Sequence, residues 1–131
     1  RIPEVKKVLE QDNNVIFSYI FGGAAKTDIK PLSPLSDIDI AVYIENTVNL
    51  PNYKLQLFDR LTDTLGTNEL DLVILNTAPA SLAGRILQNR QILTDKKPFL
   101  RHSYESITLR EFFDFKIKED IFFSLRYQIG R

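Results

Sequence analysis

The chain has 131 residues, of which 44% are hydrophobic, and this is enough for one domain with its own core. Seventeen Lys and Arg residues balance seventeen Asp and Glu residues, so the basic surplus of a nucleic-acid-binding surface is missing and no direct nucleic-acid binding is expected. The absence of Cys excludes disulfides and thiolate metal sites and agrees with a cytoplasmic location, and no apolar run approaches the roughly 18 residues of a membrane span.

The first part of the chain predicts a helix, a strand and a glycine turn. A short helix is expected over residues 3–11, where Pro suits the first turn and one apolar face follows. Residues 15–21 are nearly all apolar, which is typical of a central strand. The pair Gly22-Gly23 ends this strand. One or two helical turns are expected over 24–29, and a Pro-rich loop over 30–34.

The next predicted strand, over residues 36–44, carries two acidic residues within an apolar run. Successive side chains of a strand point to opposite faces, so Asp37 and Asp39 share one face, while Ile38 and Ile40 can enter the core. Neighbouring carboxylates repel each other, and a divalent cation with a preference for oxygen ligands relieves that repulsion. Taken alone, an Asp-x-Asp pair favours a simpler interpretation, the solvent-exposed polar face of an amphipathic strand.

The glycine pair changes the interpretation of the two carboxylates. Gly22-Gly23 lets the backbone pass close to a ligand, and the N–H groups that follow can face an anion. A tight strand exit would explain the glycines alone. A phosphate cradle beside a pair of metal-binding carboxylates, however, makes up the two halves of a nucleotide–metal site.

The second half of the chain predicts further helices and one clear strand. A helix over 52–65 presents an apolar stripe and ends at Gly66. In the strand over 69–75, alternation places Asp71 on one face with Glu69 and Val73, within a largely apolar sequence; a surface position on an edge strand is the alternative reading. The helix expected over 79–90 has three inward residues, Leu82, Ile86 and Leu87.

The C-terminal part, from about residue 98, is expected to be largely helical. A short strand at 92–93 precedes it, and a break is expected near 106–108. The order of elements predicts a mixed sheet flanked by helices, an α/β chain of the α+β type, in a single domain over residues 1–131. The last helix carries two apolar sectors, of which either both enter the core or one forms an exposed binding surface.

Three carboxylates on two strands, beside a glycine turn, are the smallest set of residues needed for two-metal phosphoryl or nucleotidyl transfer. Asp37 and Asp39 are positioned to bridge two metal ions. Asp71 would bind the metal that activates the acceptor hydroxyl, and would take its proton. The residues themselves indicate metal-dependent nucleotidyl transfer and no specific acceptor.

The segments GGAAK, SDIDIAV and ELDLVIL resemble the minimal nucleotidyltransferases of the DNA polymerase β superfamily. The resemblance spans most of the chain and implies a nucleotidyltransferase fold with ATP as substrate and two Mg²⁺ ions. It implies that the triphosphate lies at Gly22, Gly23 and Ser36, that Lys26 is a basic position after the glycine turn, and that Asp37, Asp39 and Asp71 carry the metals.

The sequence departs from the family pattern in the glycine turn. Gly23 stands where the family has Ser, so a hydroxyl contact to phosphate is lost. The loop that follows is also longer, with thirteen residues between Gly23 and Asp37 where the family has about ten. These departures bear on the affinity for nucleotide more than on the fold.

The minimal members of this family resemble antitoxins that are encoded beside HEPN-domain toxins. The resemblance implies that the transferase moves AMP from ATP to a tyrosine of the toxin. Two alternatives stay open: a transferase-like module that neutralises its partner by binding alone, and a transferase acting on a small molecule such as an aminoglycoside. The second usually needs an extra domain for its acceptor, and 131 residues leave little room for one.

Overall fold

The computed structural model describes residues 1–22, 38–46 and 49–129, the last three of them through the backbone alone. This part of the chain forms four helices and four strands in the order α1 (Ile2–Gln11), β1 (Val15–Phe21), β2 (Ile38–Ile44), α2 (Leu50–Leu65), β3 (Leu70–Ile74), α3 (Ala80–Gln88), β4 (Arg90–Asp95) and α4 (Pro98–Ile129). The strands form one sheet in the order β3-β2-β1-β4. Because β2 and β3 run parallel while β1 is antiparallel to both of its neighbours, the sheet is mixed, as expected for an α+β fold.

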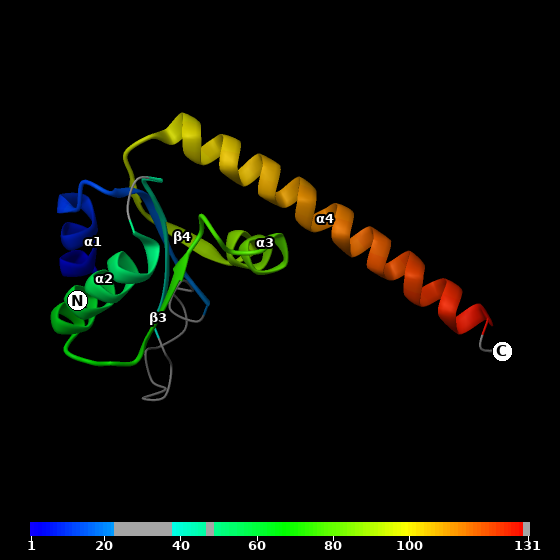
Figure 1. Ribbon diagram of the computed structural model, residues 1–131, viewed down its shortest axis with the longest axis horizontal. Helices are drawn as coiled ribbons and strands as arrows, with labels where there is room; N and C mark the ends of the chain where they lie inside the picture. The colour runs from blue at the N-terminus through cyan, green and yellow to red at the C-terminus, as the bar shows by residue number, and fades with distance from the viewer. Residues whose placement is uncertain (23–37, 47–48, 130–131) are drawn as a thin grey trace.

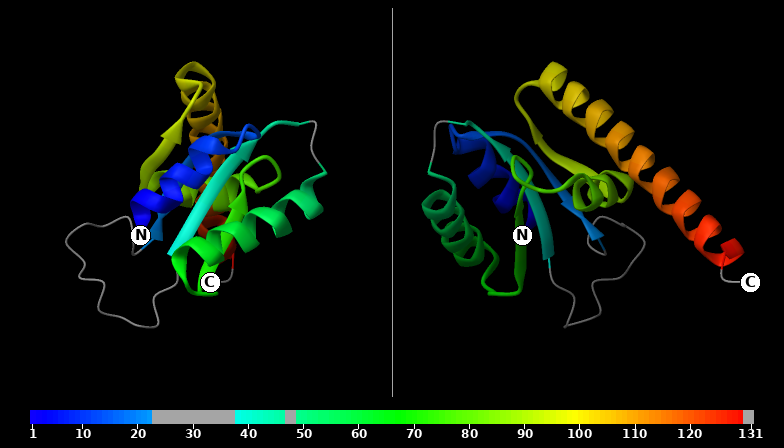
Figure 2. Two further views of the ribbon diagram at one scale, coloured as in Figure 1. Left: turned by 90° about the vertical axis from the view of Figure 1, so that its left-hand side faces the viewer. Right: turned by 45° about the vertical axis from the view of Figure 1, so that its right-hand side comes forward.

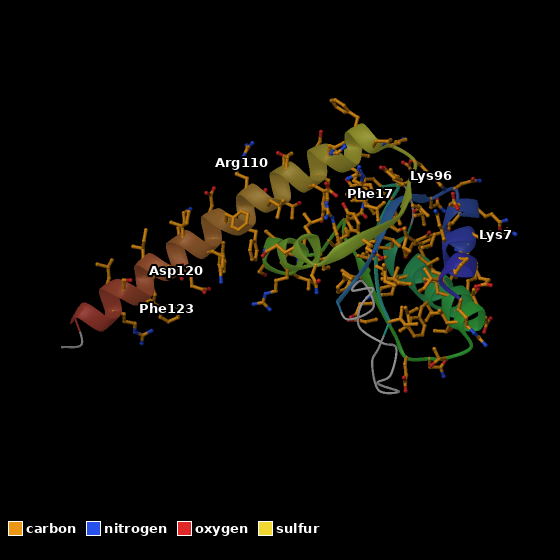
Figure 3. The ribbon with its side chains drawn as sticks, turned by 180° about the vertical axis from the view of Figure 1, so that it is seen from behind. Lys7, Phe17, Lys96, Arg110, Asp120 and Phe123 are labelled. Carbon is orange, nitrogen blue, oxygen red and sulfur yellow. The ribbon has the colours of Figure 1, made fainter. Side chains whose placement is uncertain are left out.

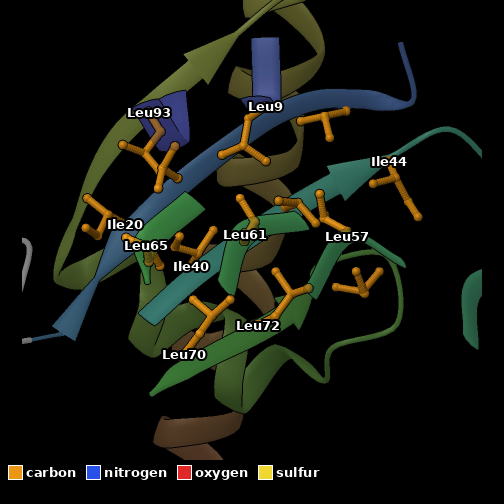
Figure 4. Close-up of a cluster of buried hydrophobic side chains, with 14 of the residues drawn as sticks. Leu9, Ile20, Ile40, Ile44, Leu57, Leu61, Leu65, Leu70, Leu72 and Leu93 are labelled. Atoms are coloured by element: carbon orange, nitrogen blue, oxygen red, sulfur yellow. The ribbon is translucent and has the colours of Figure 1, made fainter. Parts of the chain in front are cut away.

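The sheet lies between two helical layers (Figures 1 and 2). Helices α1 and α2 cover one face, and a largely aliphatic cluster of side chains fills the space between them and the sheet (Figure 4). Helix α3 and the first half of α4 cover the other face. That second core is partly aromatic: the rings of Phe17 and Tyr43 stack with centroids 4.8 Å apart, and Tyr104 of α4 packs against both.

Strand β1 is central, as its apolar sequence predicts. A register shift between Val15 and Phe17 turns Ile16 and Phe17 toward the same core, because a bulge interrupts the alternation of faces. Helix α2 begins after Asn49, whose side chain accepts a hydrogen bond from the backbone N–H of Asn52. It ends at Gly66, which has φ of 72° and closes the helix in the left-handed conformation.

Three expectations from the sequence need correction. The short strand at 92–93 is a six-residue strand, β4, paired with β1 along its length. Leu82 is not inward: its side chain is 38% exposed, while Ile86 and Leu87 of the same helix are buried. Helix α4 continues without a break through 106–108, because Thr108 is buried and the flanking turns pack on the sheet and on α3.

A buried polar cluster fastens the first turns of α4 to the sheet. The hydroxyl of Tyr19 donates to Glu105 at 2.6 Å, and the guanidinium groups of Arg90 and Arg101 donate to the same carboxylate. Arg101 also donates to Asp95 at 2.8 Å. Burial raises the pKa of Glu105, but the hydrogen bonds from Tyr19 and Arg90 and the arginine charges outweigh it, so that its pKa is held below the usual range.

Beyond Phe112, α4 leaves the rest of the molecule and extends as a free-standing arm (Figures 1 and 3). Phe112 is the last large apolar residue of α4 that is buried. The side chains from 113 to 126 are almost all exposed. Within the described residues, no helix combines the length and apolar character that crossing a membrane requires.

Candidate functional site

Asp39 and Asp71 lie side by side on adjacent strands. They are register partners in the parallel pair formed by β2 and β3, so their Cα atoms are separated by one inter-strand spacing of about 4.8 Å. Alternation places both on the face of the sheet that carries Ala41 and Val73. Asp39 is half-buried and Asp71 is exposed. The period-two pattern of the two strands therefore predicts their convergence correctly.

Gly22 lies directly against Asp39 on the side away from Asp71. Phe21, at the end of β1, is the register partner of Asp39, and the chain turns at Gly22 with φ of 70°. A Cβ atom on Gly22 would come within 2.4 Å of Oδ2 of Asp39, so a side chain here would displace the carboxylate. The N–H of Gly22 donates to the carbonyl of Asn89 at 3.2 Å, which ties the turn to the end of α3.

The remaining predicted site residues lie outside the described part of the chain. These are Gly23, Lys26, Ser36 and Asp37, and their assignment remains a prediction from the sequence. Among the described residues, no group of three or more His, Cys, Asp and Glu side chains gathers as a metal site. The described part of the site thus contributes two of the three predicted carboxylates.

The two carboxylates present fit a hard divalent cation such as Mg²⁺. Their oxygen donors are of the type that Mg²⁺ prefers, and the cation would offset the repulsion between neighbouring negative charges. Because Gly22 has no side chain, its backbone lies directly beside Oδ2 of Asp39. Asp39 and Asp71 are therefore the described residues that would hold the metal, with Asp37 expected to complete the set.

An open, largely apolar cleft of about 730 Å³ adjoins Asp71. Strand β3 forms its floor, because Asp71 and Val73 line it. Lys54 lies on the wall formed by the beginning of α2, and Leu82 of α3 lies on the opposite wall. The exposure of Leu82, which periodicity places inside, is thus explained by its position on this wall.

The cleft residues could not be recognised in the sequence. Lys54 and Leu82 are ordinary members of amphipathic helices, and no motif marks them. They come together because α2 and α3 pack on opposite faces of the sheet beside its edge strand, β3. Phe21, which also lines the cleft, gives no signal other than its place before the glycine turn.

Comparison with known structures gives matches among toxin–antitoxin complexes. A chain of a mutant MntA–HpeT toxin–antitoxin has a TM-score of 0.77 at 18% identity over 95% of this chain and 96% of that chain. A toxin–antitoxin with AMP-PNP gives 0.76 at 19% identity over the same shares. A tri-AMPylated Shewanella oneidensis HEPN toxin in complex with MNT antitoxin gives 0.68 at 18% identity, over 93% and 94%. At these identities the likeness shows a shared fold.

Sequence comparison identifies the family. The model of the family described as polymerase beta, nucleotidyltransferase, matches residues 3–99, from α1 to the start of α4. No curated protein matches the chain significantly. Because the family match covers most of the chain and includes both strands that carry the site, the chain belongs to the polymerase β nucleotidyltransferase family.

Proposed function

We propose that this protein is a metal-dependent nucleotidyltransferase that works as an antitoxin, transferring AMP from ATP to a tyrosine of a cognate HEPN toxin in the cytoplasm. The observation that carries the proposal is the register pairing of Asp39 with Asp71 beside the Gly22 turn. It joins two carboxylates to a backbone turn suited to phosphate, and membership of the nucleotidyltransferase family gives this arrangement its reaction class.

The proposed roles follow from the positions along the sheet edge. Asp37, Asp39 and Asp71 hold two Mg²⁺ ions. When bound, these ions supply charge stabilisation to the phosphates and to the attacking oxygen. Asp71, exposed on the edge strand, accepts the proton of the acceptor hydroxyl.

The triphosphate is proposed to lie on the other side of Asp39, at the glycine turn. Gly22, whose own N–H is hydrogen-bonded to the carbonyl of Asn89, lets the backbone turn close to Asp39. Gly23 supplies a backbone N–H group, and Ser36 and Lys26 complete the cradle. The half-buried carboxylate of Asp39 stands between this cradle and Asp71, where metal ions shared by nucleotide and acceptor belong.

The choice of a toxin as acceptor rests on the structural neighbours and on α4. One neighbour is a complex with a tri-AMPylated HEPN toxin, and another contains AMP-PNP. The arm of α4 supports a protein partner independently. Phe113, Ile117, Ile121 and Leu125 follow one another at intervals of four residues, and each is between 50% and 57% exposed. A contiguous apolar stripe of this kind usually marks a protein–protein contact.

Incubation of the purified protein with its partner, Mg²⁺ and ATP labelled on the α-phosphate tests the reaction. Label is expected on the partner, and none is expected when the γ-phosphate is labelled instead, since pyrophosphate leaves. Loss of the label in the Asp39→Asn variant ties the transfer to this site. Label from the γ-position would indicate phosphorylation and would contradict nucleotidyl transfer.

A second candidate function is neutralisation of the partner by binding alone. The exposed apolar stripe on α4 favours it, because this surface serves a stable complex whether or not AMP is transferred. Gly23 in place of a serine favours it too, since it removes a hydroxyl from the proposed phosphate cradle. Inhibition of the partner that survives in Asp39→Asn, without any label, would support this second function.

A further inference from the structure

Apart from Asp71, the residues that line the cleft have no part in holding metal or triphosphate in the function proposed above. The volume of the cleft, about 730 Å³, falls in the range of sites that enclose a small molecule or a large side chain. The lining includes Phe21, Leu50, Val73 and Leu82, together with the charged residues Lys54 and Asp71. The role of this cleft follows from where it lies along the sheet and from the chemistry of its walls.

Strand order places most of the cleft away from the phosphate side of the site. Across the sheet the order is Asp71 on β3, Asp39 on β2, and the Gly22 turn at the end of β1. A triphosphate at the glycine turn therefore lies on one side of Asp39. The cleft lies mainly on the other side, where α2, β3 and the segment leading into α3 line it, and it reaches back to Phe21 at the end of β1. In phosphoryl and nucleotidyl transfer the attacking and leaving oxygens are roughly in line. The acceptor consequently approaches from the side of Asp71.

The walls of the cleft favour an aromatic acceptor over a sugar. A polyhydroxylated or aminated sugar would lose water against Leu50, Val73 and Leu82 without hydrogen bonds in return. A phenol, by contrast, buries an apolar ring and keeps one hydroxyl for a polar partner. Asp71 offers an acceptor for that hydroxyl at the edge of the cleft.

We propose that this cleft is the acceptor subsite and that it receives the side chain of a tyrosine presented by the partner protein; the inference rests on the nucleotidyl transfer proposed above. The phenolic oxygen forms a bond to the α-phosphorus of ATP, and the bond from that phosphorus to the bridging oxygen breaks. Its electron pair leaves with pyrophosphate, and the phenolic proton passes to the carboxylate of Asp71. The positive charge of Lys54 in the same cleft stabilises the negative charge that develops on the phenolic oxygen as it loses its proton.

The first test compares two leucines changed in the same way. Leu82→Arg places a charge on the cleft wall, whereas Leu55→Arg makes the same change at a residue of α2 that is 63% exposed and does not line the cleft. The rate of AMP transfer is measured while the concentrations of partner and of ATP are varied separately. Leu82→Arg is expected to raise the KM for the partner about tenfold or more, the effect of about 1.4 kcal/mol, and to leave the KM for ATP unchanged. Leu55→Arg is expected to change neither.

The second test uses the wild-type protein and needs no transfer. N-acetyl-L-tyrosinamide is titrated into protein with labelled Leu and Val methyl groups, and N-acetyl-L-alaninamide serves as the control. Shifts at Leu50, Val73 and Leu82, with Leu55 unmoved, support the proposal. Shifts that occur although no AMP reaches the partner would sustain the subsite while refuting the proposed function.

Two results would overturn the subsite. One is active transfer to the partner with an unchanged partner KM in Leu82→Arg, which would leave the proposed function standing. The other is a change in the chemical shifts of the cleft methyl groups with AMP-PNP and none with the tyrosine analogue, which would show that the cleft binds the adenine base.

Discussion

Gly22 and Asp39 fit together so closely that no side chain can be added to the glycine. A Cβ atom at Gly22 would lie 2.4 Å from Oδ2 of Asp39, and its φ of 70° lies in the left-handed region. Gly66 provides a matched case, because its φ is 72° and an added Cβ would meet the guanidinium of Arg1 at 2.5 Å. The long side chain of Arg1 can move away, whereas Asp39 can escape only by leaving its position in the site.

This relationship predicts different outcomes for the two glycines. Gly22→Ala and Gly66→Ala are both expected to lower the free energy of unfolding by about 1–2 kcal/mol, the cost of a left-handed L-residue. Only Gly22→Ala is expected to weaken binding of AMP-PNP with Mg²⁺, because it also displaces the Asp39 carboxylate. Denaturant unfolding and calorimetric titration measure the two effects. Equal nucleotide affinity in both variants would show that the glycine turn is remote from the nucleotide.

Asp39→Asn is expected to reduce AMP transfer by about 100-fold or more, as loss of one strong electrostatic contact in the transition state does. The variant keeps the size of the side chain, so the circular dichroism spectrum is expected to stay that of the wild type. Asp63→Asn, at an exposed position of α2, removes the same charge away from the site and is the control. Full activity of the Asp39→Asn variant would remove Asp39 from the catalytic machinery.

The carboxylate of Glu105 is expected to make stability depend on pH in acid. Its pKa is lowered in the folded protein, so its contribution is present above the ordinary Glu value of about 4.3 and is lost as the pH falls through the folded pKa. Glu105→Gln is expected to cost about 3 kcal/mol at neutral pH, since Arg90 and Arg101 lose their buried anion. Urea unfolding between pH 7 and pH 3 should show a shallower loss for this variant than for the wild type.

Glu111→Gln is the control for that experiment, because Glu111 lies on an exposed position of the same helix. It is expected to keep both the stability and the acid dependence of the wild type. If Glu105→Gln retained the full acid dependence, the polar cluster of Tyr19, Arg90, Arg101 and Glu105 would not be what fastens α4 to the sheet.

The arm of α4 is expected to hold the partner. Phe113→Asp combined with Ile117→Asp should weaken the complex by more than about 2 kcal/mol if these side chains are central to the interface, without altering the melting temperature, since both are exposed. Phe99→Asp is a control on the same helix, because Phe99 is 86% exposed at its other end. The affinity for the partner is measured by surface plasmon resonance. Equal affinities for the wild type, the double variant and Phe99→Asp would show that the interface lies elsewhere than on the arm.

The sequence predicts the parts of this fold that depend on local periodicity. Alternation predicts which side chains within each acidic strand share a face, and the parallel register of β2 and β3 then places Asp39 beside Asp71; Gly66 marks the end of α2. The contacts that join distant segments leave no such signal. Tyr19 lies within an apolar strand, and its partner Glu105 is 86 residues away. Only the packing of α4 on the sheet brings them together.

The lack of a local sequence signal for long-range contacts also explains the predictions that were wrong. Ser106, Ile107 and Thr108 are weak helix formers, yet α4 continues through them because its tertiary contacts outweigh the local preference. Helical periodicity places Leu82 inside, but α3 lies beside the edge strand, so that Leu82 lines the cleft and does not enter the core. The two apolar sectors of α4 predict an excess of apolar surface. Which part is exposed depends on where the contacts of α4 with the rest of the fold end, just after Phe112.

Intact-mass spectrometry of the partner protein tests the central claim most directly. The partner is co-expressed with the wild-type chain, with Asp37→Ala and with Asp39→Asn, and each complex is purified and weighed. The account predicts a partner that carries one or more AMP groups with the wild type and none with either variant. A partner that is bound and inactive but unmodified in all three preparations would contradict transfer and leave binding as the function.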